Sequence, residues 1–556
     1  MSFSNRAAPV ERRSPDRVVG GNEPDTTRPP AGLAGVQDAD FGQDDRAARR
    51  RDGGAMRRGQ GMAIVLAVGA LVLTGCSTPA PSSSGSPTST AGSPPAGSAS
   101  STAPLGSPSA TSTTSAAGAE GAGDPYFRLD GNGGYDALHY DLAVTVLPGS
   151  RSITGVATLT ARALQPLTRF DLDLHGLTVS SVTVGTTRAT FRRDGQELVV
   201  TPRTTLPVGQ QFRVTVRYAG RPELLKVESN DGSEPDNGWY ATADGATVMG
   251  EPQGASVWFP VSEHPSDKAT YDVAITVPKG LTAISNGLPV GGPVTANGVT
   301  TWRWHSEHPM ASYLVLLTVG KYDIRRSTTS TGVPIIDAVD PTLGSIADAE
   351  LAKQREVIDV LSKAFGPYPI EAAGGVVDTF GADVALETQT RSVYSASMFK
   401  NGDNTYVIAH ETAHQWFGDS VSLARWQDIW LNEGFATYGE ILWGEHIGAL
   451  KPTEIIDNVF ASVSPGDAMW KVDIGDPGPL DLFSPAVYQR GGLVLQALRE
   501  KVGDDAFFRT LQTWAHDHRD GNGTTEQFIA LAQQISGQDL TALFQKWLFS
   551  TGRPLK

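Results

Sequence analysis

The residues most able to do chemistry are two histidines and two glutamates in one short stretch. His410 and His414 are four positions apart, Glu411 directly follows the first histidine, and Glu433 comes after eighteen further residues. On a helix, residues four apart project from one face, so both imidazoles can reach one metal ion. The carboxylate of Glu433 supplies a third ligand and leaves a fourth position for water. We therefore expect one zinc ion (Zn²⁺) per chain, held by His410, His414 and Glu433.

Glu411 lies one step along the same helix from His410, where it can take a proton from a water at the metal. Zinc lowers the pKa of a bound water from about 15.7 towards roughly 7 and polarises a substrate carbonyl. The expected role of Glu411 is that of general base. The five-residue pattern alone also arises by chance on surface helices, and it is the spaced Glu433 that favours a catalytic metal site.

The surrounding stretch resembles a known family. Residues 407–438 read VIAHETAHQWFGDSVSLARWQDIWLNEGFATY, which is similar to the zinc core of the aminopeptidase N family. These gluzincin aminopeptidases remove N-terminal residues from peptides. The resemblance covers about Asp124 to Lys556 and implies hydrolysis of the first peptide bond of peptides with a free N-terminus. Two alternatives remain, a thermolysin-like endopeptidase with the same metal site and a non-catalytic surface-binding lipoprotein, although the latter should have lost zinc ligands or Glu411.

The family resemblance also implies residues that recognise the substrate's α-amine. Family members carry a G-x-M-E-N strand ahead of the zinc helix, and in the matching segment 384–388 only Glu387 is kept. It is the expected amine anchor, against the alternative of an exposed strand carboxylate. A second amine contact is implied for Glu251, fourteen positions before Pro265. Its alternative is a solvated loop residue.

A hydrogen-bond donor for the tetrahedral oxyanion is implied in the same way. The segment 486–492 resembles the tyrosine-containing step that follows the third ligand in the family, and its tyrosine is Tyr488. A donor aimed at the oxyanion lowers the barrier by a few kcal/mol, on the order of a hundredfold or more in rate. The alternative for Tyr488 is half-buried packing ahead of a helix.

Metal-bound histidines usually donate their second ring N–H to a carboxylate or a carbonyl. Thr437 and Glu440 lie on the same helical face as Glu433, and either could serve. Bulky tryptophans near the site are expected in the core: Trp416, Trp426, Trp430 and Trp443. Histidines elsewhere are also expected to pack without chemistry: His139, His264, His308 and His446.

The first quarter of the chain indicates export. Arg57 and Arg58 precede an apolar run, Met62 to Leu73, which ends in Leu-Thr-Gly-Cys at Cys76. Twelve apolar residues are too few to span a bilayer, which needs about twenty. We therefore interpret residues 56–76 as a lipoprotein signal peptide with a lipobox, lipidated at Cys76. That lipid would anchor the chain on the extracytoplasmic face of the cell membrane.

The segments on either side of this signal do not look like domains. Residues 1–55 are polar and lack apolar periodicity, so we expect a disordered or non-translated extension with Met56 as the natural start. Residues 77–123 consist of Ser, Pro, Thr, Gly and Ala and are expected to form a disordered linker. The formal net charge of −15 argues against nucleic acid as a partner.

The elements that must position the site fall into two domains, and together they predict an α+β fold. Residues 124–325 show period two and predict an antiparallel β-domain, which by resemblance is the family's saddle-like N-terminal domain with 313–322 as its last strand. Residues 326–556 show helical periodicity and resemble a thermolysin-like catalytic domain. The strands are expected around four alternating runs: 140–146, 170–174, 212–218 and 271–277.

Two helical segments of the second domain carry clear signals. An apolar stripe from Leu351 to Phe365 ends at Gly366-Pro367, where a helix should stop. Further on, Thr524 and Gln527 have the spacing of a capping box that begins a helix.

Overall fold

The computed structural model describes residues 117–230, 232, 234–402 and 404–554. The expected extension (1–55), the signal peptide (56–76), Cys76 and the linker up to residue 116 lie outside the described residues. Within the described part of the chain, no helix combines the length and apolar character needed to cross a membrane.

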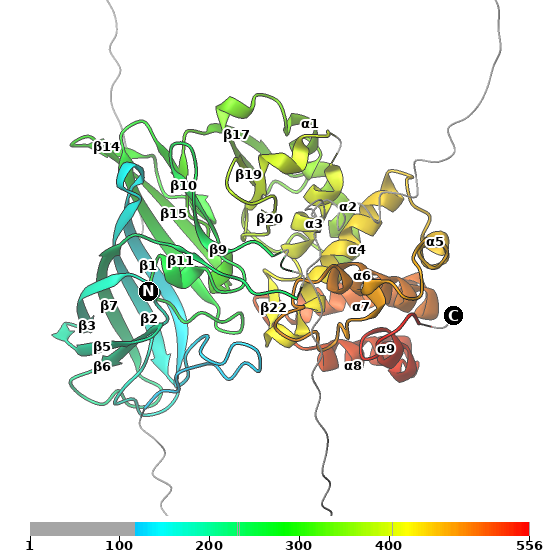
Figure 1. The fold of residues 1–556 in the computed structure, drawn as a ribbon, viewed down its shortest axis with the longest axis horizontal. Helices are drawn as coiled ribbons and strands as arrows, with labels where there is room; N and C mark the ends of the chain where they lie inside the picture. The colour runs from blue at the N-terminus through cyan, green and yellow to red at the C-terminus, as the bar shows by residue number, and fades with distance from the viewer. Residues whose placement is uncertain (1–116, 231, 233, 403, 555–556) are drawn as a thin grey trace, which may run out of the picture. The chain divides into compact units, whose positions relative to one another are not determined.

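A β-domain comes first, from cyan to green in Figure 1. Its largest sheet has nine strands among the described residues, in the order β13-β15-β11-β1-β2-β7-β3-β4 with β14 beside β15. Alternation produces this sheet because inward-facing side chains such as Tyr140 and Leu142 are buried while their neighbours are not. The strands are β1 (Tyr135–Leu147), β2 (Ser152–Ala163), β3 (Thr178–Val184), β4 (Thr187–Arg188), β7 (Gln211–Gly220), β11 (Ala269–Pro278), β13 (Leu288–Pro289), β14 (Val294–Ala296) and β15 (Val299–Met310).

The expectation of a wholly antiparallel domain is wrong at one pair of strands. β1 and β11 run parallel, with Tyr140 opposite Tyr271. A long connection, residues 148–268, separates the two strands in sequence, and parallel pairing requires such a crossover. The rings of Tyr140 and Tyr271 stack with centroids 5.1 Å apart, which packs the centre of the sheet.

The run 170–174 is not a strand, although its alternation predicted one. It forms only isolated bridges, such as Phe170 with Val200, and it lies beside the hairpin of β5 (Thr190–Asp194) and β6 (Glu197–Thr201). Its polar positions are not open to water, since Asp171 and Asp173 are 0% and 1% exposed. Asp173 instead accepts a hydrogen bond of 2.9 Å from the amide of Asn132. Asp171 lies 3.5 Å from the guanidinium of Arg169. A hydrogen bond at Asp173 and an ion pair at Asp171 thus take the place of water.

The last seven residues of the expected linker also differ from the prediction. Residues 117–123 lie against the β-domain, where Gly118 donates to the Arg169 carbonyl at 2.8 Å and Ala122 donates to the Asp130 carbonyl at 2.8 Å. A Cβ at Gly118 would come within 2.5 Å of the Gly133 carbonyl. Here the small residues allow two backbones to pack closely, which composition alone does not distinguish from a flexible tether.

A second, five-stranded sheet of the β-domain runs toward the catalytic half in the order β12-β16-β10-β9-β8. The expected last strand, 313–322, contains a 3₁₀ turn at Ser312–Leu314 and only a short strand. The turn leaves the Tyr313 hydroxyl directed at Glu387. The strands are β8 (Leu224–Leu225), β9 (Asn237–Ala241), β10 (Ala246–Met249), β12 (Thr282–Ile284) and β16 (Thr318–Gly320).

The catalytic half begins with its own five-stranded sheet, in the order β17-β18-β19-β21-β20. β17 pairs with β18, so the position expected for the domain boundary, between residues 325 and 326, falls inside β17. The strands are β17 (Asp323–Thr328), β18 (Pro334–Val339), β19 (Gly375–Asp378), β20 (Ala385–Leu386) and β21 (Ser392–Ser395), with a further parallel pair of β22 (Val421–Leu423) and β23 (Gly521–Gly523).

Helices form the rest of this half, and the α+β fold is as expected (Figure 1). Most of the predicted apolar stripe lies on α2 (Gln354–Phe365), but its first residue, Leu351, ends the separate short helix α1 (Asp348–Leu351). α2 ends before Gly366, which has a φ of 100°. The capping box of Thr524 and Gln527 is present at the start of α8. The helices are α1 (Asp348–Leu351), α2 (Gln354–Phe365), α3 (Thr405–His414), α4 (Trp430–His446), α5 (Ile455–Ser462), α6 (Pro485–Val502), α7 (Asp504–Asp517), α8 (Thr525–Ser536) and α9 (Thr541–Trp547).

Glycines bring α3, α4 and α6 into close contact. A Cβ at Gly439 of α4 would lie 2.6 Å from the Ala413 Cβ of α3, and one at Gly434 would lie 2.8 Å from the Gly491 Cα of α6. Larger residues at these crossings would push the helices apart. Tryptophans expected in the core are at most 1% exposed around this bundle: Trp416, Trp426, Trp430 and Trp443.

A half-buried lysine joins the two halves of the molecule. The Lys268 ammonium, just ahead of β11, donates to the carbonyls of Asp419 at 2.7 Å and Ser420 at 2.8 Å. Those carbonyls belong to the turn that follows α3. Burial lowers the pKa of Lys268 to about 7, since removing an ammonium from water disfavours its charged form.

Candidate active site

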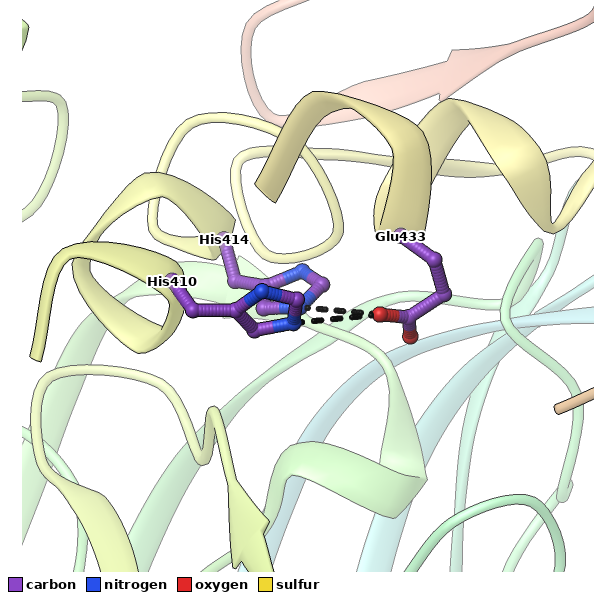
Figure 2. Close-up of side chains that lie close together, drawn as sticks. All are labelled: His410, His414 and Glu433. Atoms are coloured by element: carbon purple, nitrogen blue, oxygen red, sulfur yellow. Dashed lines mark hydrogen bonds and ion pairs between the residues drawn. The ribbon is translucent and has the colours of Figure 1, made fainter. Parts of the chain in front are cut away.

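The two histidines of α3 and the glutamate of α4 converge on one point (Figure 2). The Nε2 atoms of His410 and His414 lie 3.3 and 3.4 Å from the same carboxylate oxygen of Glu433. Candidate ligand atoms of the three residues lie within 4.8 Å of one another, and all three residues are buried. Glu433 is in the first turn of α4, where the helix dipole favours a carboxylate.

The second ring nitrogen of each histidine, Nδ1, already has a hydrogen-bond partner. His410 Nδ1 lies 2.8 Å from the carboxylate of Glu440, and His414 Nδ1 lies 3.1 Å from the carbonyl of Phe417. Both Nδ1 atoms therefore carry the proton, which leaves both Nε2 lone pairs for a metal. Of the two residues considered for this role, Thr437 does not take part. Its buried hydroxyl has no hydrogen-bond partner among the described residues.

Gly418 makes the Phe417 contact possible. It has a φ of 128°, a conformation that glycine adopts without strain. A Cβ at this position would lie 3.2 Å from His414 Nδ1. The turn after α3 can therefore bring its carbonyl up to the histidine.

We predict that Glu440→Gln weakens zinc affinity by about 10- to 100-fold, the usual loss when the partner of a metal-bound histidine is removed. Competition with a chromogenic chelator would measure the dissociation constant. Glu454→Gln is a matched control, because Glu454 is exposed and pairs with Lys451 away from the site. Equal zinc affinity in both variants would contradict the role of Glu440.

The electrostatics of the cluster favour positive charge at its centre. Burial alone would lower the pKa of His410, but hydrogen bonds to Glu433 and Glu440 raise it well above 6.5. Burial is likewise outweighed at His414, where Glu387 and Glu433 raise the pKa to about 9. Two imidazoles and a carboxylate are a donor set that suits Zn²⁺. The residues present therefore fit zinc, whose binding would displace protons from the histidines.

Glu411 is buried in the same site, with 5% of its surface exposed. Burial raises the pKa of Glu411 to about 8, against the opposing effect of His410 and His414. A divalent cation held by the histidines would bring this pKa down again, because a nearby positive charge favours the carboxylate. Glu411 is thus suited to exchange a proton near neutral pH.

Glu387 directly follows β20 and is 3% exposed, so it is not the exposed carboxylate of the alternative interpretation. Its Oε1 accepts a hydrogen bond of 3.2 Å from the Tyr313 hydroxyl. The Gln415 side chain donates to the Glu387 carbonyl at 3.0 Å and accepts from the Thr390 amide at 2.8 Å. Gln415 thereby ties the end of the zinc helix to the strand that carries Glu387.

Glu251 lies in the turn after β10 and contributes a second, half-buried carboxylate. Its Oε1 has no partner within the described residues. Burial raises the pKa of Glu251 well above 4.5, and the negative charges of Glu387 and Glu433 add to this effect. An ammonium group placed between Glu251 and Glu387 would relieve both the burial and the repulsion.

Tyr488 lies in the first turn of α6, within the helix rather than ahead of it. The helix begins with Ser484 as its cap and Pro485 at its first position, a combination that favours helix starts. The ring of Tyr488 lies nearly parallel to that of His410, with centroids 5.9 Å apart. Burial raises the pKa of Tyr488, so the hydroxyl stays protonated and can donate a hydrogen bond.

Sequence reasoning missed three groups of this site. Gln415 directly follows the second histidine, and that adjacency is the signal that could have identified it. Tyr313 comes from a turn in the other domain, with no recognisable spacing to the two histidines. The Phe417 group is a main-chain carbonyl, which any residue type could supply.

Two family models match this chain. The Peptidase family M1 domain matches residues 382–547, and the Peptidase M1 N-terminal domain matches residues 136–314. Among curated proteins, the chain is 26% identical over 321 residues to leucyl aminopeptidase of Saccharolobus solfataricus, covering 54% of this chain and 40% of that protein. It is 25% identical over 452 residues to glutamyl aminopeptidase of Sus scrofa, covering 75% and 48%. The chain thus spans about half the length, or less, of these curated relatives.

Solved structures give a match over nearly a whole protein. An M1 zinc metallopeptidase from Deinococcus radiodurans, in a variant bound to Tyr-Ser-Ala, is 32% identical with a TM-score of 0.71. The match covers 78% of this chain and 99% of that one. A two domain M1 zinc metallopeptidase bound to L-arginine gives the same values. The chain is therefore a two-domain member of peptidase family M1, the family of zinc metallopeptidases.

Proposed function

We propose that this protein is a zinc-dependent aminopeptidase that hydrolyses the N-terminal peptide bond of peptides. One observation carries the proposal: two carboxylates, the buried Glu387 and the half-buried Glu251, lie beside the cluster of His410, His414 and Glu433. An endopeptidase would not need them, because its substrate brings no ammonium group into the site. The names of the relatives, leucyl and glutamyl aminopeptidase, support the same activity.

The side chains have distinct roles in the proposed reaction. Glu387 and Glu251 bind the α-ammonium and so set the first peptide bond at the metal ligands. A zinc ion bound by the cluster would supply Lewis acidity toward the scissile carbonyl and an activated water. Glu411 takes the proton of the attacking water and passes it to the leaving amine. Tyr488 donates a hydrogen bond to the oxyanion of the tetrahedral intermediate.

Blocking the substrate amine tests this proposal. Acetylation removes the positive charge that Glu387 and Glu251 would bind, so we predict that kcat/KM falls at least tenfold, or roughly 1.4 kcal/mol or more. The measurement compares free and acetylated forms of one internally quenched peptide. Cleavage of both at similar rates would support the thermolysin-like endopeptidase instead.

We also propose that the protein is a lipoprotein anchored through Cys76 on the extracytoplasmic face of the cell membrane. The supporting observation is the order of a basic pair, a short apolar run and Leu-Thr-Gly-Cys. We predict a mature N-terminus at a diacylated Cys76 by mass spectrometry, and no lipid on Cys76→Ala. Mature surface protein that retains residues 1–55 would contradict this proposal.

A further inference from the structure

A cavity of about 100 Å³ opens beside the proposed amine site. Glu251 and Tyr488 form part of its wall, so it begins where the α-amine and the scissile bond would lie. The residues of β20, Ala385 and Leu386, line it directly before Glu387. A cavity in this position can receive the first side chain of a substrate.

The charged residues of this cavity all have the same sign. Glu234, Asp236 and Glu251 line it, and no lysine or arginine does so among the described residues. Glu251 is already assigned to the α-amine. Glu234 and Asp236 add two further negative charges to the wall, and these favour a second positive charge on the same substrate residue.

Both further carboxylates lie at the wall of this cavity, where Glu234 is half-buried and Asp236 is exposed. The backbone of Asp236 is held in place, because its carbonyl accepts a hydrogen bond from the Tyr240 hydroxyl. Glu234 lines this cavity and also the adjoining cavity of about 260 Å³. Glu234 therefore lies where the first cavity continues into the second.

A buried acceptor points to a ligand that donates hydrogen bonds. Asn237 is 4% exposed and lines both cavities. Its side-chain oxygen has no hydrogen-bond partner among the described residues. A buried carbonyl oxygen without a partner is unfavourable, and a guanidinium or ammonium group in the cavity would satisfy it.

The rest of the wall is apolar and suits the methylene stem of a long cationic side chain. Lysine and arginine bury their stems along apolar surface while their charged ends remain with polar partners. The apolar wall comes from both domains: Tyr240, Met249, Val384, Leu386 and Phe483.

We propose that this cavity selects peptides whose N-terminal residue is arginine or lysine, with Glu234, Asp236 and Asn237 binding the cationic end of that side chain. This inference rests on the proposed aminopeptidase function and adds the substrate class. Aspartate and glutamate in the first position are excluded by repulsion from Glu234 and Asp236. Apolar residues fit the walls but bring no positive charge to Glu234 and Asp236 and no hydrogen-bond donor to Asn237.

The decisive experiment compares cationic side chains with neutral ones of similar shape. Arginine and citrulline are nearly identical in shape, but only arginine is cationic. Norleucine has the four-carbon stem of lysine without its ammonium group. With aminoacyl-aminomethylcoumarin substrates of the full chain, we expect kcat/KM to be at least tenfold higher for arginine than for citrulline and for lysine than for norleucine. The preference should shrink with added salt, because screening weakens partly exposed charge pairs.

Variants that remove one negative charge each test whether Glu234 and Asp236 cause the preference for a cationic side chain. Glu234→Gln and Asp236→Asn should each lower the arginine-to-citrulline ratio at least threefold, and the double variant should lower it further. Glu223→Gln is the matched control, since Glu223 is exposed and lines neither cavity. Its ratio should equal that of the wild type.

The possible failures are distinguishable. Equal rates for arginine and citrulline in an active enzyme would overturn the inference and leave the aminopeptidase intact. A charge preference that survives the double variant would overturn the assignment of Glu234 and Asp236. Absence of cleavage for every free aminoacyl substrate would overturn the proposed function itself.

Discussion

Replacing Glu411 by glutamine is expected to lower kcat by about 10²- to 10⁴-fold, the range that a general base contributes. Glutamine keeps the shape of the side chain but cannot accept the proton of the attacking water. Because Glu411 is buried beside His410 and His414 without being one of the three converging ligands, zinc should stay bound. Steady-state kinetics with metal analysis of the same sample measures both quantities.

Glu371→Gln provides a control on the same domain, because the Glu371 side chain accepts from the Glu307 amide near the surface. It should retain wild-type turnover. Full activity of Glu411→Gln would refute the proposed base. Loss of zinc together with activity would instead place Glu411 among the ligands.

Replacing one of the three zinc-binding residues should also have a large effect. It should lower the zinc content of the protein as well as its rate. We predict one zinc per chain in the wild type and less than about a tenth of that in His410→Ala, since two remaining donors do not make a structural or catalytic zinc site. Elemental analysis after dialysis against a weak chelator measures the ratio. The same variant should also unfold at a lower temperature when zinc is present, because it no longer gains stability from binding.

His446→Ala is the corresponding control. His446 pairs with Glu356 at the surface and should leave zinc content unchanged. A wild type that is active without zinc, or a His410→Ala variant that keeps a full equivalent, would refute the metal site.

Local patterns in the sequence were sufficient for the parts of the site that lie on single helices. His410 and His414 share a face because four residues make about one turn, and the capping box of Thr524 needs only its own first turn. The order of Glu433 behind them also follows from one motif. Such features depend on backbone geometry within a few residues, so they can be predicted from the local sequence alone.

Features that depend on distant segments could not be predicted in this way. The hydroxyl of Tyr313 reaches Glu387 from the other domain, and no spacing relates the two residues. Asp173 alternates with apolar residues like a solvent-facing strand position, yet a hydrogen bond from the distant Asn132 allows it to be buried. The same limit applies to cavity walls, which are assembled from loops of both domains.

The contact of Lys268 with the turn after α3 has a consequence for the lifetime of the protein. Through Phe417 that turn holds His414, so a lysine of the β-domain and a ligand of the metal act on the same few residues. A ligand that binds only the native state stabilises it, by about 4.1 kcal/mol at a thousandfold excess over its dissociation constant. Zinc would therefore protect both domains against unfolding. In zinc-poor surroundings the chain would be degraded faster, because proteases cut the transiently opened form.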